Sequence, residues 1–159
     1  MTTDRAAAQH SPVELYSRVT NTLDSVSWSI LAIPMRIAGF SVFMRSGLVK
    51  LDDWSSTLEL FRSEYKVPVL PPEIAAYLAS GMELGCSTLL LLGLATRFAA
   101  LGLLGMIAVI QLFVYPNAWP DHIQWLAFLF PLVMRGAGKY SLDALVLHII
   151  GGRAPATPE

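Results

Sequence analysis

The sequence predicts an all-α fold, a bundle of four transmembrane helices with amphipathic helices flanking it at the membrane interface. Three observations lead to this prediction. Only 14% of the 159 residues are charged, whereas soluble domains have about 25%. The mean hydropathy is +0.53. Four apolar stretches occur along the chain, at residues 28–49, 74–94, 98–115 and 123–134.

Composition also excludes several classes of protein. The formal net charge of −1 excludes a basic nucleic-acid binder, and the apolar content excludes a disordered chain. A single cysteine, Cys86, excludes a disulfide scaffold. Because its sequence neighbours are mostly apolar, we expect Cys86 to be a packing group. The length fits one domain.

Residues 1–27 are expected to form an amphipathic segment on the cytoplasmic surface. Ser11 can cap a helix that has Pro12 at its first position and Glu14 three residues after the cap, as in a capping box. No apolar core followed by a small-residue cleavage site occurs here, so a cleavable signal is not expected. A frayed polar tail is the alternative. The apolar residues at helical spacing are Leu15, Val19, Leu23 and Val26.

Residues 28–135 are expected to form the membrane domain. The stretch 28–49 is long enough to cross a hydrocarbon core of about 30 Å at about 1.5 Å per residue. The stretch 123–134 contains Pro131 and is short enough to be re-entrant instead of spanning. Its assignment therefore needs a second argument.

The distribution of positive charge supplies that argument. With the N-terminus inside and four crossings, six Lys and Arg residues lie in cytoplasmic segments and three in outer loops. Cytoplasmic loops are enriched in Lys and Arg, so both termini are predicted to be cytoplasmic. The membrane is expected to be the inner membrane of a bacterium. The six are Arg5, Arg18, Arg97, Arg135, Lys139 and Arg153, and the three are Lys50, Arg62 and Lys66.

The first outer loop is predicted to contain a short helix at about residues 53–66. Asp53 can cap this helix. Its apolar residues share one side, which predicts packing against the bundle or the membrane interface. These residues are Trp54, Leu58, Phe61 and Tyr65.

Residues 136–159 are expected to form a second cytoplasmic amphipathic helix and a tail. Ser141 can cap the helix, and Asp143 lies in its first turn, where the helix dipole favours an anion. Gly151 and Gly152 are expected to end the helix. Its apolar face comprises Leu142, Leu145, Val146, Ile149 and Ile150.

Two charged residues fall inside the predicted spans. Arg36 and Glu83 both lie near mid-depth, and we predict that they pair, because a lone charge there costs about 2.5–3.5 kcal/mol. The pair is either functional or a buried device that fixes helix register. Lys50 lies at the outer rim of the bundle-facing stripe, where Asp52 and Asp53 are close enough to neutralise it.

Polar residues gather toward the predicted outer end of the bundle. They could line a pocket for a polar head group such as a quinone ring. They could equally be ordinary interfacial residues beside Trp119 and Trp125, which suit an aromatic belt. These polar residues are Lys50, Gln111, Tyr115, His122 and Gln124.

No catalytic constellation, metal site or intrinsic cofactor site is recognisable in the sequence. The three histidines are scattered over both predicted sides, which does not suit a bis-histidine haem site, and one cysteine cannot hold an iron–sulfur cluster. Neither a phosphate-binding loop nor an HExxH motif occurs. Redox chemistry would therefore need another chain or a diffusible cofactor such as quinone.

Four sequence elements occur in order across the predicted spans: Arg36-x6-Phe43-x3-Gly47-x2-Lys50-Leu51, Glu83, Leu92-Gly93-Leu94-x-Thr96-Arg97-x-Ala99-Ala100, and Gly136-x-Gly138-Lys139-Tyr140-Ser141-Leu142-Asp143. Together they resemble the DoxX family over about residues 33–145. The resemblance implies that the fourth stretch crosses the membrane. It also assigns seven residues to positions of the family pattern, namely Arg36, Gly47, Lys50, Glu83, Arg97, Gly138 and Asp143.

The DoxX resemblance also implies a field of activity. Members are linked to thiosulfate:quinone oxidoreductase, to quinol oxidation and to membrane oxidoreductase assemblies. We therefore expect a non-catalytic subunit or anchor of a quinone-linked redox assembly, with quinone near Glu83 or the outer pocket. Expected partners are lipid, a redox enzyme and another copy of the chain, without nucleic acid. A small transporter or channel-like protein and a structural membrane scaffold are the alternatives.

Overall fold

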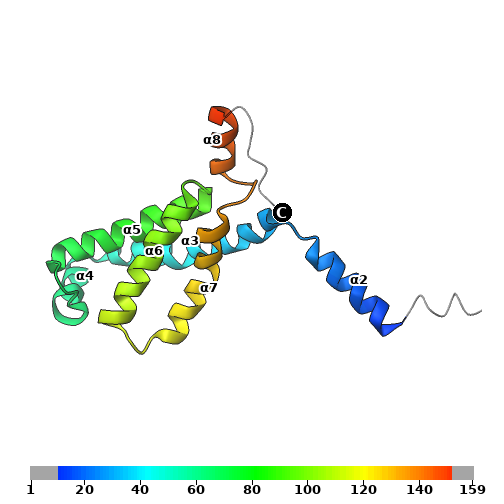
Figure 1. Cartoon of the computed structure of the whole chain (residues 1–159). Coiled ribbons are helices and arrows are strands. Elements are labelled where there is room, and N and C mark those ends of the chain that lie inside the picture. Colours follow the sequence, from blue (N-terminus) through cyan, green and yellow to red (C-terminus); the bar gives the residue numbers. More distant parts are fainter. Residues whose placement is uncertain (1–10, 152–159) are drawn as a thin grey trace, which may run out of the picture.

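The computed structural model describes residues 11–151, and all regular secondary structure in that range is helical. This confirms the predicted all-α class for the described part of the chain (Figure 1). The predicted features at residues 1–10 and 152–159, including Arg5, Gly152 and Arg153, lie outside the described residues. The helices are α2 (Pro12–Asp24), α3 (Trp28–Asp52), α4 (Trp54–Leu60), the π-helix η2 (Phe61–Tyr65), α5 (Pro72–Leu92), α6 (Thr96–Val109), the π-helix η3 (Ile110–Val114), α7 (Trp119–Arg135) and α8 (Leu142–Gly151).

Four of these elements form the bundle: α3 packs against α5 and α7, and α6 packs against α5 and α7. The approach of α3 to α5 depends on small residues of α3. A Cβ on Gly47 would lie 2.7 Å from two side-chain carbons of Leu84, and one on Gly39 would lie 2.8 Å from Leu90. In lipid the hydrophobic effect does not drive helices together, so their association depends on close van der Waals packing, which small residues permit. The fully buried core includes Ala32, Leu90, Leu103, Ile107, Leu129 and Leu132.

Two helices are long and apolar enough to cross a membrane, namely Pro72–Leu92 and the continuous helix Thr96–Val114. The helices α2 and α3 pass the same test only together, and they are bent by 70° at the break between them. The helix α7 has 17 residues, about 25 Å at about 1.5 Å per residue. It extends the predicted stretch 123–134 at both ends. The structure thus confirms helices at all four predicted stretches, with two or three candidate spans among them.

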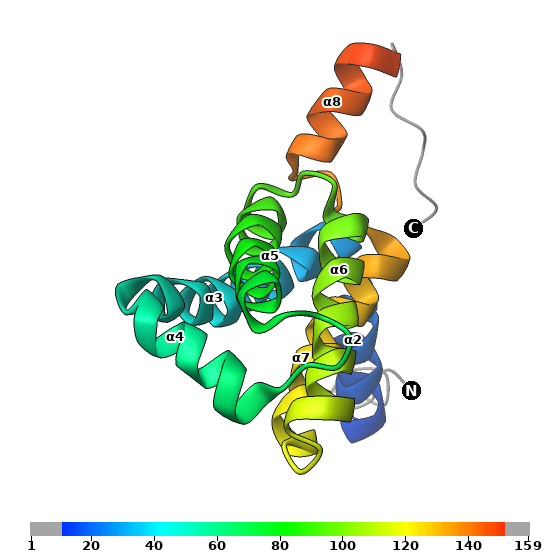
Figure 2. The same ribbon diagram turned by 90° about the vertical axis from the view of Figure 1, so that its left-hand side faces the viewer.

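The flanking helices form where the sequence predicts them. The hydroxyl of Ser11 accepts a hydrogen bond from the Glu14 N–H at 3.2 Å, so α2 is a capped helix and not a frayed tail. No residue of α2 is buried. Ser141 caps α8 by accepting from the Ala144 N–H at 3.2 Å. Both helices project from the end of the bundle opposite α4, and Figure 2 shows α8 standing clear of the bundle.

The predicted loop helix is present as α4 continued by η2. Asp53 caps it, accepting from the Ser56 N–H at 3.0 Å. Hydrogen bonds from Ser56 and then Ser55 lower the pKa of Asp53 to about 2. The Asp53 carboxylate is therefore used locally. Neither Asp52 nor Asp53 forms a salt bridge with Lys50 among the described residues.

At the α8 end, Asp143 joins three elements. Its N–H donates to the Gly93 carbonyl at 2.8 Å, and its carboxylate accepts from the N–H groups of Ala95 and Thr96 at 2.7 and 3.1 Å. No side chain from the α5–α6 turn caps α6. A residue from the first turn of α8 therefore caps the start of α6, and its acidic charge suits that helix N-terminus.

Gly138 offers a sharp test of packing at this end. Its φ is +77°, and a Cβ there would lie 2.7 Å from the backbone Cα of Ser29, an atom that cannot rotate away. We expect Gly138→Ala to lower the free energy of unfolding by about 1–3 kcal/mol, measured by denaturation in detergent. The control is Gly85→Ala, a mid-helix glycine with open space beside it, which should be neutral or stabilising. Equal losses in the two variants would contradict the packing argument.

Candidate functional site

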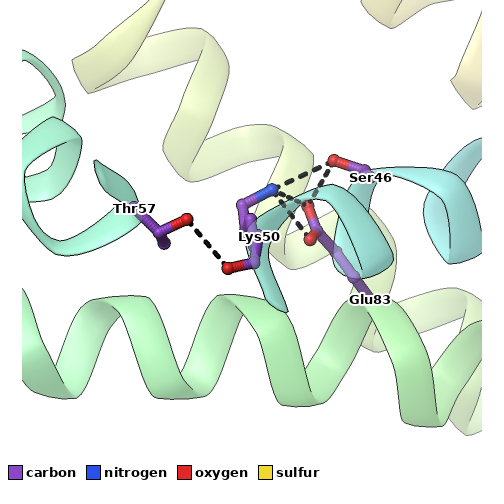
Figure 3. Close-up of polar contacts among 4 residues, drawn as sticks. All are labelled: Ser46, Lys50, Thr57 and Glu83. Atoms are coloured by element: carbon purple, nitrogen blue, oxygen red, sulfur yellow. Dashed lines mark hydrogen bonds and ion pairs between the residues drawn. The ribbon is translucent and has the colours of Figure 1, made fainter. Parts of the chain in front are cut away.

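A buried ion pair joins α3 and α5. The Lys50 ammonium lies 2.9 and 2.8 Å from the two carboxylate oxygens of Glu83, whose side chain is 5% exposed. Ser46, one turn before Lys50, donates to Glu83 at 3.0 Å and accepts from Lys50 at 3.0 Å. Thr57 of α4 donates to the Lys50 carbonyl at 3.0 Å, tying the end of α3 to the loop helix (Figure 3).

The predicted pairing of Arg36 with Glu83 is wrong. Arg36 is buried, but it donates to backbone carbonyls: Leu90 at 2.8 Å, Leu91 at 2.6 Å and Tyr140 at 2.7 Å, with Ala137 at 3.5 Å. The first two belong to the last turn of α5, where the helix dipole is negative and carbonyls lack i+4 helical partners. The Leu90 carbonyl also accepts from the Gly93 N–H at 3.1 Å. Arg36 therefore makes its hydrogen bonds to carbonyls, and the carboxylate that interacts with its charge is Asp143, not Glu83.

Helix register explains the error. The first two turns of α3 extend past the end of α5, where the Trp28 indole donates to the Gly136 carbonyl at 3.1 Å and Ser29 accepts from the Lys139 N–H at 2.9 Å. Arg36 consequently lies level with the α5–α6 turn and not at mid-depth. The part of α3 that faces Glu83 lies about 11 residues later, at Ser46, Gly47 and Lys50. A Cβ placed on Gly47 would lie 3.2 Å from the Glu83 Cβ.

The ion pair lies in the wall of a cavity of about 580 Å³. The helices α3, α5, α6 with η3, and α7 surround this cavity, and η2 with the loop after it covers the α4 end. Most of the lining is apolar. Leu78 on α5 and Gly105 and Val109 on α6 line the cavity and are also exposed at the surface of the bundle. The cavity is therefore open between α5 and α6, and also at the α4 end, where the lining residues Leu70, Tyr115 and Asp121 are exposed.

Aromatic rings form two clusters in the cavity wall. On the α7 side, Trp125 lies edge-on to Phe43 at 5.6 Å between ring centroids and tilted against His122 at 5.1 Å. On the loop side, Tyr65 lies edge-on to Phe61 at 4.8 Å and to Tyr115 at 5.6 Å. All of these residues line the cavity. Aromatic walls of this kind favour a ligand that contains a flat ring.

The rim at the α4 end is polar. The Tyr115 hydroxyl donates to Glu64 of η2, which links the cavity cover to the end of η3. Hydrogen bonding to Glu64, with a smaller contribution from burial, raises the pKa of Tyr115 above its ordinary value. Tyr115 therefore stays a hydrogen-bond donor at physiological pH.

The structure brings together part of the predicted outer pocket. Lys50, Tyr115 and His122 line the cavity, and Gln111 lies behind His122, with its amide oxygen 2.5 Å from His122 Nδ1. Gln124 does not belong to the pocket, because it is exposed and its amide donates to the Pro120 carbonyl one turn back.

The remaining residues of the family pattern lie at two places. Gly47 is at the crossing beside Glu83, whereas Gly138 and Asp143 are at the α8 end with Arg36. Arg97 is exposed there and lies beside Gly136. The family pattern therefore contains two groups of residues. Lys50, Glu83 and Gly47 lie at or beside the cavity, and the others lie at the α8 end, where Arg36 and Asp143 bond to neighbouring elements.

Sequence analysis did not identify Ser46 or Phe43 as site residues. Ser46 and Lys50 are four residues apart on one helix, a spacing that places side chains on the same face. That spacing was the available signal for Ser46, since a polar pair on a bundle-facing stripe needs a partner across the interface.

Comparison with known proteins identifies the family. The sequence matches the DoxX family model over residues 31–116, more than half of the chain. The chain belongs to the DoxX family. A protein of Haemophilus influenzae, described only as uncharacterized, is 31% identical over 117 residues, which cover 67% of this chain and 77% of the relative. No solved structure matches the chain.

The matched residues of this DoxX protein contain Lys50 and Glu83 but end before α7. The cavity is thus built partly from matched helices and partly from His122 and Trp125, which lie beyond them. As a DoxX membrane protein with apolar helices, the chain contacts lipid. Family membership alone does not assign a ligand to the cavity.

Proposed function

We propose that this DoxX protein is a membrane subunit or anchor of a redox assembly and that its cavity takes a membrane-soluble ring compound of the quinone class. The observation behind the proposal is the cavity itself, which combines aromatic walls with one internally neutralised ion pair. Its volume of about 580 Å³ falls within the usual range of about 300–1,000 Å³ for small-molecule sites. Non-catalytic by itself, the chain would serve a partner that supplies the redox chemistry.

The proposal includes a topology of four crossings in a bacterial inner membrane, with both termini inside. The position of α2 and α8 at one end and α4 at the other supports it (Figure 1). Cysteines placed in a Cys86→Ser background test it with a membrane-impermeant maleimide. Asn117→Cys should be labelled in intact cells, and Ser17→Cys and Leu147→Cys only after permeabilisation. Labelling of Leu147→Cys in intact cells would mean that α7 does not cross.

The opening between α5 and α6 indicates the route of entry. A gap between two spans faces hydrocarbon, so a ligand dissolved in the bilayer reaches the ion pair without passing through water. The lining is neutral apart from Asp121 at the exposed rim, because Lys50 and Glu83 cancel. Both properties favour an uncharged, apolar ligand.

Blocking the opening provides a direct test of ligand binding. Gly105→Leu places a side chain in open space beside the cavity. We expect it to reduce binding of the reduced, hydroquinone form of a photoreactive short-chain benzoquinone at least about tenfold, the loss that about 1.4 kcal/mol produces. Gly85→Leu is the matched control, since this glycine also has open space beside it but lies outside the lining. Equal labelling of the two variants would contradict the assignment of the cavity.

Docking of a redox partner is tested by purification from the native host in mild detergent. The exposed apolar residues of α2 and α8, such as Leu15, Leu23 and Ile149, are the surfaces proposed to contact the membrane or the partner. A stoichiometric flavin-, haem- or thiosulfate-handling chain should co-purify. Purification of the chain as a homo-oligomer alone would count against the subunit role.

Transport is the second candidate, and the buried ion pair inside a cavity favours it, since intramembrane ionisable residues often mark solute or proton pathways. Proteoliposomes containing the purified chain would then show a proton or solute flux that Glu83→Gln abolishes. If the proteoliposomes show no proton or solute flux, transport is contradicted and the binding role remains the proposal.

A further inference from the structure

The hydrogen bonds around His122 fix its tautomer. The Gln111 amide nitrogen donates to the Pro116 carbonyl at 2.7 Å, which directs the amide oxygen toward His122 Nδ1. Nδ1 must therefore carry the hydrogen and donate it. In a neutral imidazole the other nitrogen, Nε2, is then an acceptor.

Nothing in the described chain uses that acceptor. His122 is 2% exposed and lines the cavity, yet its hydrogen bond within residues 11–151 is the one through Nδ1. Gln111, which holds Nδ1, lies outside the lining. Because His122 lines the cavity, a ligand that fills the cavity without offering a donor would leave Nε2 buried and unpaired, which is costly.

The donors at the ion pair and at the rim of the cavity, by contrast, are occupied. The three N–H bonds of Lys50 go to Ser46 and to both oxygens of Glu83. The Ser46 hydroxyl donates to Glu83, and the Tyr115 hydroxyl donates to Glu64. A ligand carbonyl that approached Lys50, Ser46 or Tyr115 would have to displace one of these contacts.

We propose that His122 determines specificity by accepting a hydrogen bond at Nε2 from a hydroxyl group of the ring ligand. The cavity then prefers hydroxyl-bearing rings, phenols and quinols, over rings of the same size that lack a hydroxyl. Gln111 is a positioning residue, because it holds the tautomer that leaves Nε2 free to accept. This inference rests on the proposed binding function and names the form of ligand that the cavity takes.

The experiment compares two probes of nearly equal size, 4-hexylphenol and its methyl ether 4-hexylanisole. Each competes with a diazirine-bearing alkylphenol for photolabelling of the full chain in nanodiscs, with concentrations corrected by partitioning into empty nanodiscs. The phenol should compete about tenfold better, the scale expected for leaving a buried acceptor unpaired. His122→Phe should make the two competitors equal, and Gln111→Leu should reduce the preference.

A second measurement does not depend on the folding of the variants. In wild-type protein labelled with ¹⁵N-histidine, the His122 Nε2 signal should have the shift of an unprotonated nitrogen and should move when 4-hexylphenol is added but not when 4-hexylanisole is added. Equal competition by the two compounds in wild type would overturn the hydroxyl recognition and leave ring binding intact. Absence of specific labelling in the cavity would overturn the binding function as well.

Discussion

Replacing Lys50 with methionine should lower the free energy of unfolding by about 3–5 kcal/mol, because the change leaves the Glu83 carboxylate buried without its partner. Methionine keeps most of the volume of the side chain, so the loss reports charge and not packing. The measurement is reversible denaturation in detergent, followed by circular dichroism. Arg45→Met is the control, an exposed cation on the same helix, and it should change stability by less than about 0.5 kcal/mol.

A double variant separates pairing from other losses. In Lys50→Met with Glu83→Gln no charge remains buried, so most of the lost stability should return, as it does where whole buried ion pairs are replaced. The two residues share hydrogen bonds with Ser46, so their effects should be strongly non-additive. Additive losses would show that Lys50 and Glu83 do not interact in the membrane.

Replacing Arg36 with methionine should be at least as damaging. Three short hydrogen bonds to the carbonyls of Leu90, Leu91 and Tyr140 are lost. The Leu90 carbonyl keeps the Gly93 N–H, but a buried carbonyl left without a partner costs about 1–3 kcal/mol. We expect a loss of about 3 kcal/mol or more, together with increased proteolysis of the chain after Gly136, which Arg36 holds against the end of α5.

A second variant, Arg36→Lys, separates the effect of charge from that of hydrogen-bond geometry. It keeps the positive charge near the α5 dipole but loses the planar guanidinium, whose several N–H groups reach carbonyls on both sides. We expect roughly half of the methionine loss. If Lys restored full stability, charge alone would account for the role of Arg36 and the geometry of its hydrogen bonds would be unimportant.

The sequence predicts the helices well because their signals are local. The caps at Ser11, Asp53 and Ser141 form as expected, since each side chain needs only a backbone N–H two or three residues away. The extents of the four long helices follow from runs of apolar residues in the same way. Nothing about distant parts of the chain is needed for either.

Pairing across helices could not be predicted, because it depends on register. Counting residues from the predicted membrane boundary placed Arg36 at the depth of Glu83, but α3 extends past α5 by about two turns. The signal that fixes the register is steric: Gly39 and Gly47 are where α5 can approach α3. A sequence shows the glycines but not which residues of the neighbouring helix face them.

The candidate pocket was predicted in part for the same reason. Lys50, Tyr115 and His122 share the cavity because three separate helix ends converge there, which topology alone suggests. Gln111 supports His122 from behind, whereas the Gln124 amide bonds to its own helix. Which of the two glutamines meets His122 depends on how each helix is rotated about its axis. A rotation of one residue, about 100°, exchanges such roles.

The opening between α5 and α6 has a consequence for how strongly the cavity needs to bind. A hydrophobic ligand partitions into the bilayer, so its local concentration there greatly exceeds its average concentration in the cell, and the bilayer acts as a reservoir. Occupancy depends on concentration relative to Kd, so a site fed from that reservoir fills even when its contacts are few and weak. Selection among lipophilic compounds then rests on one or two directed polar contacts and on rapid exchange, and a DoxX protein built this way would sample the membrane pool instead of storing a ligand.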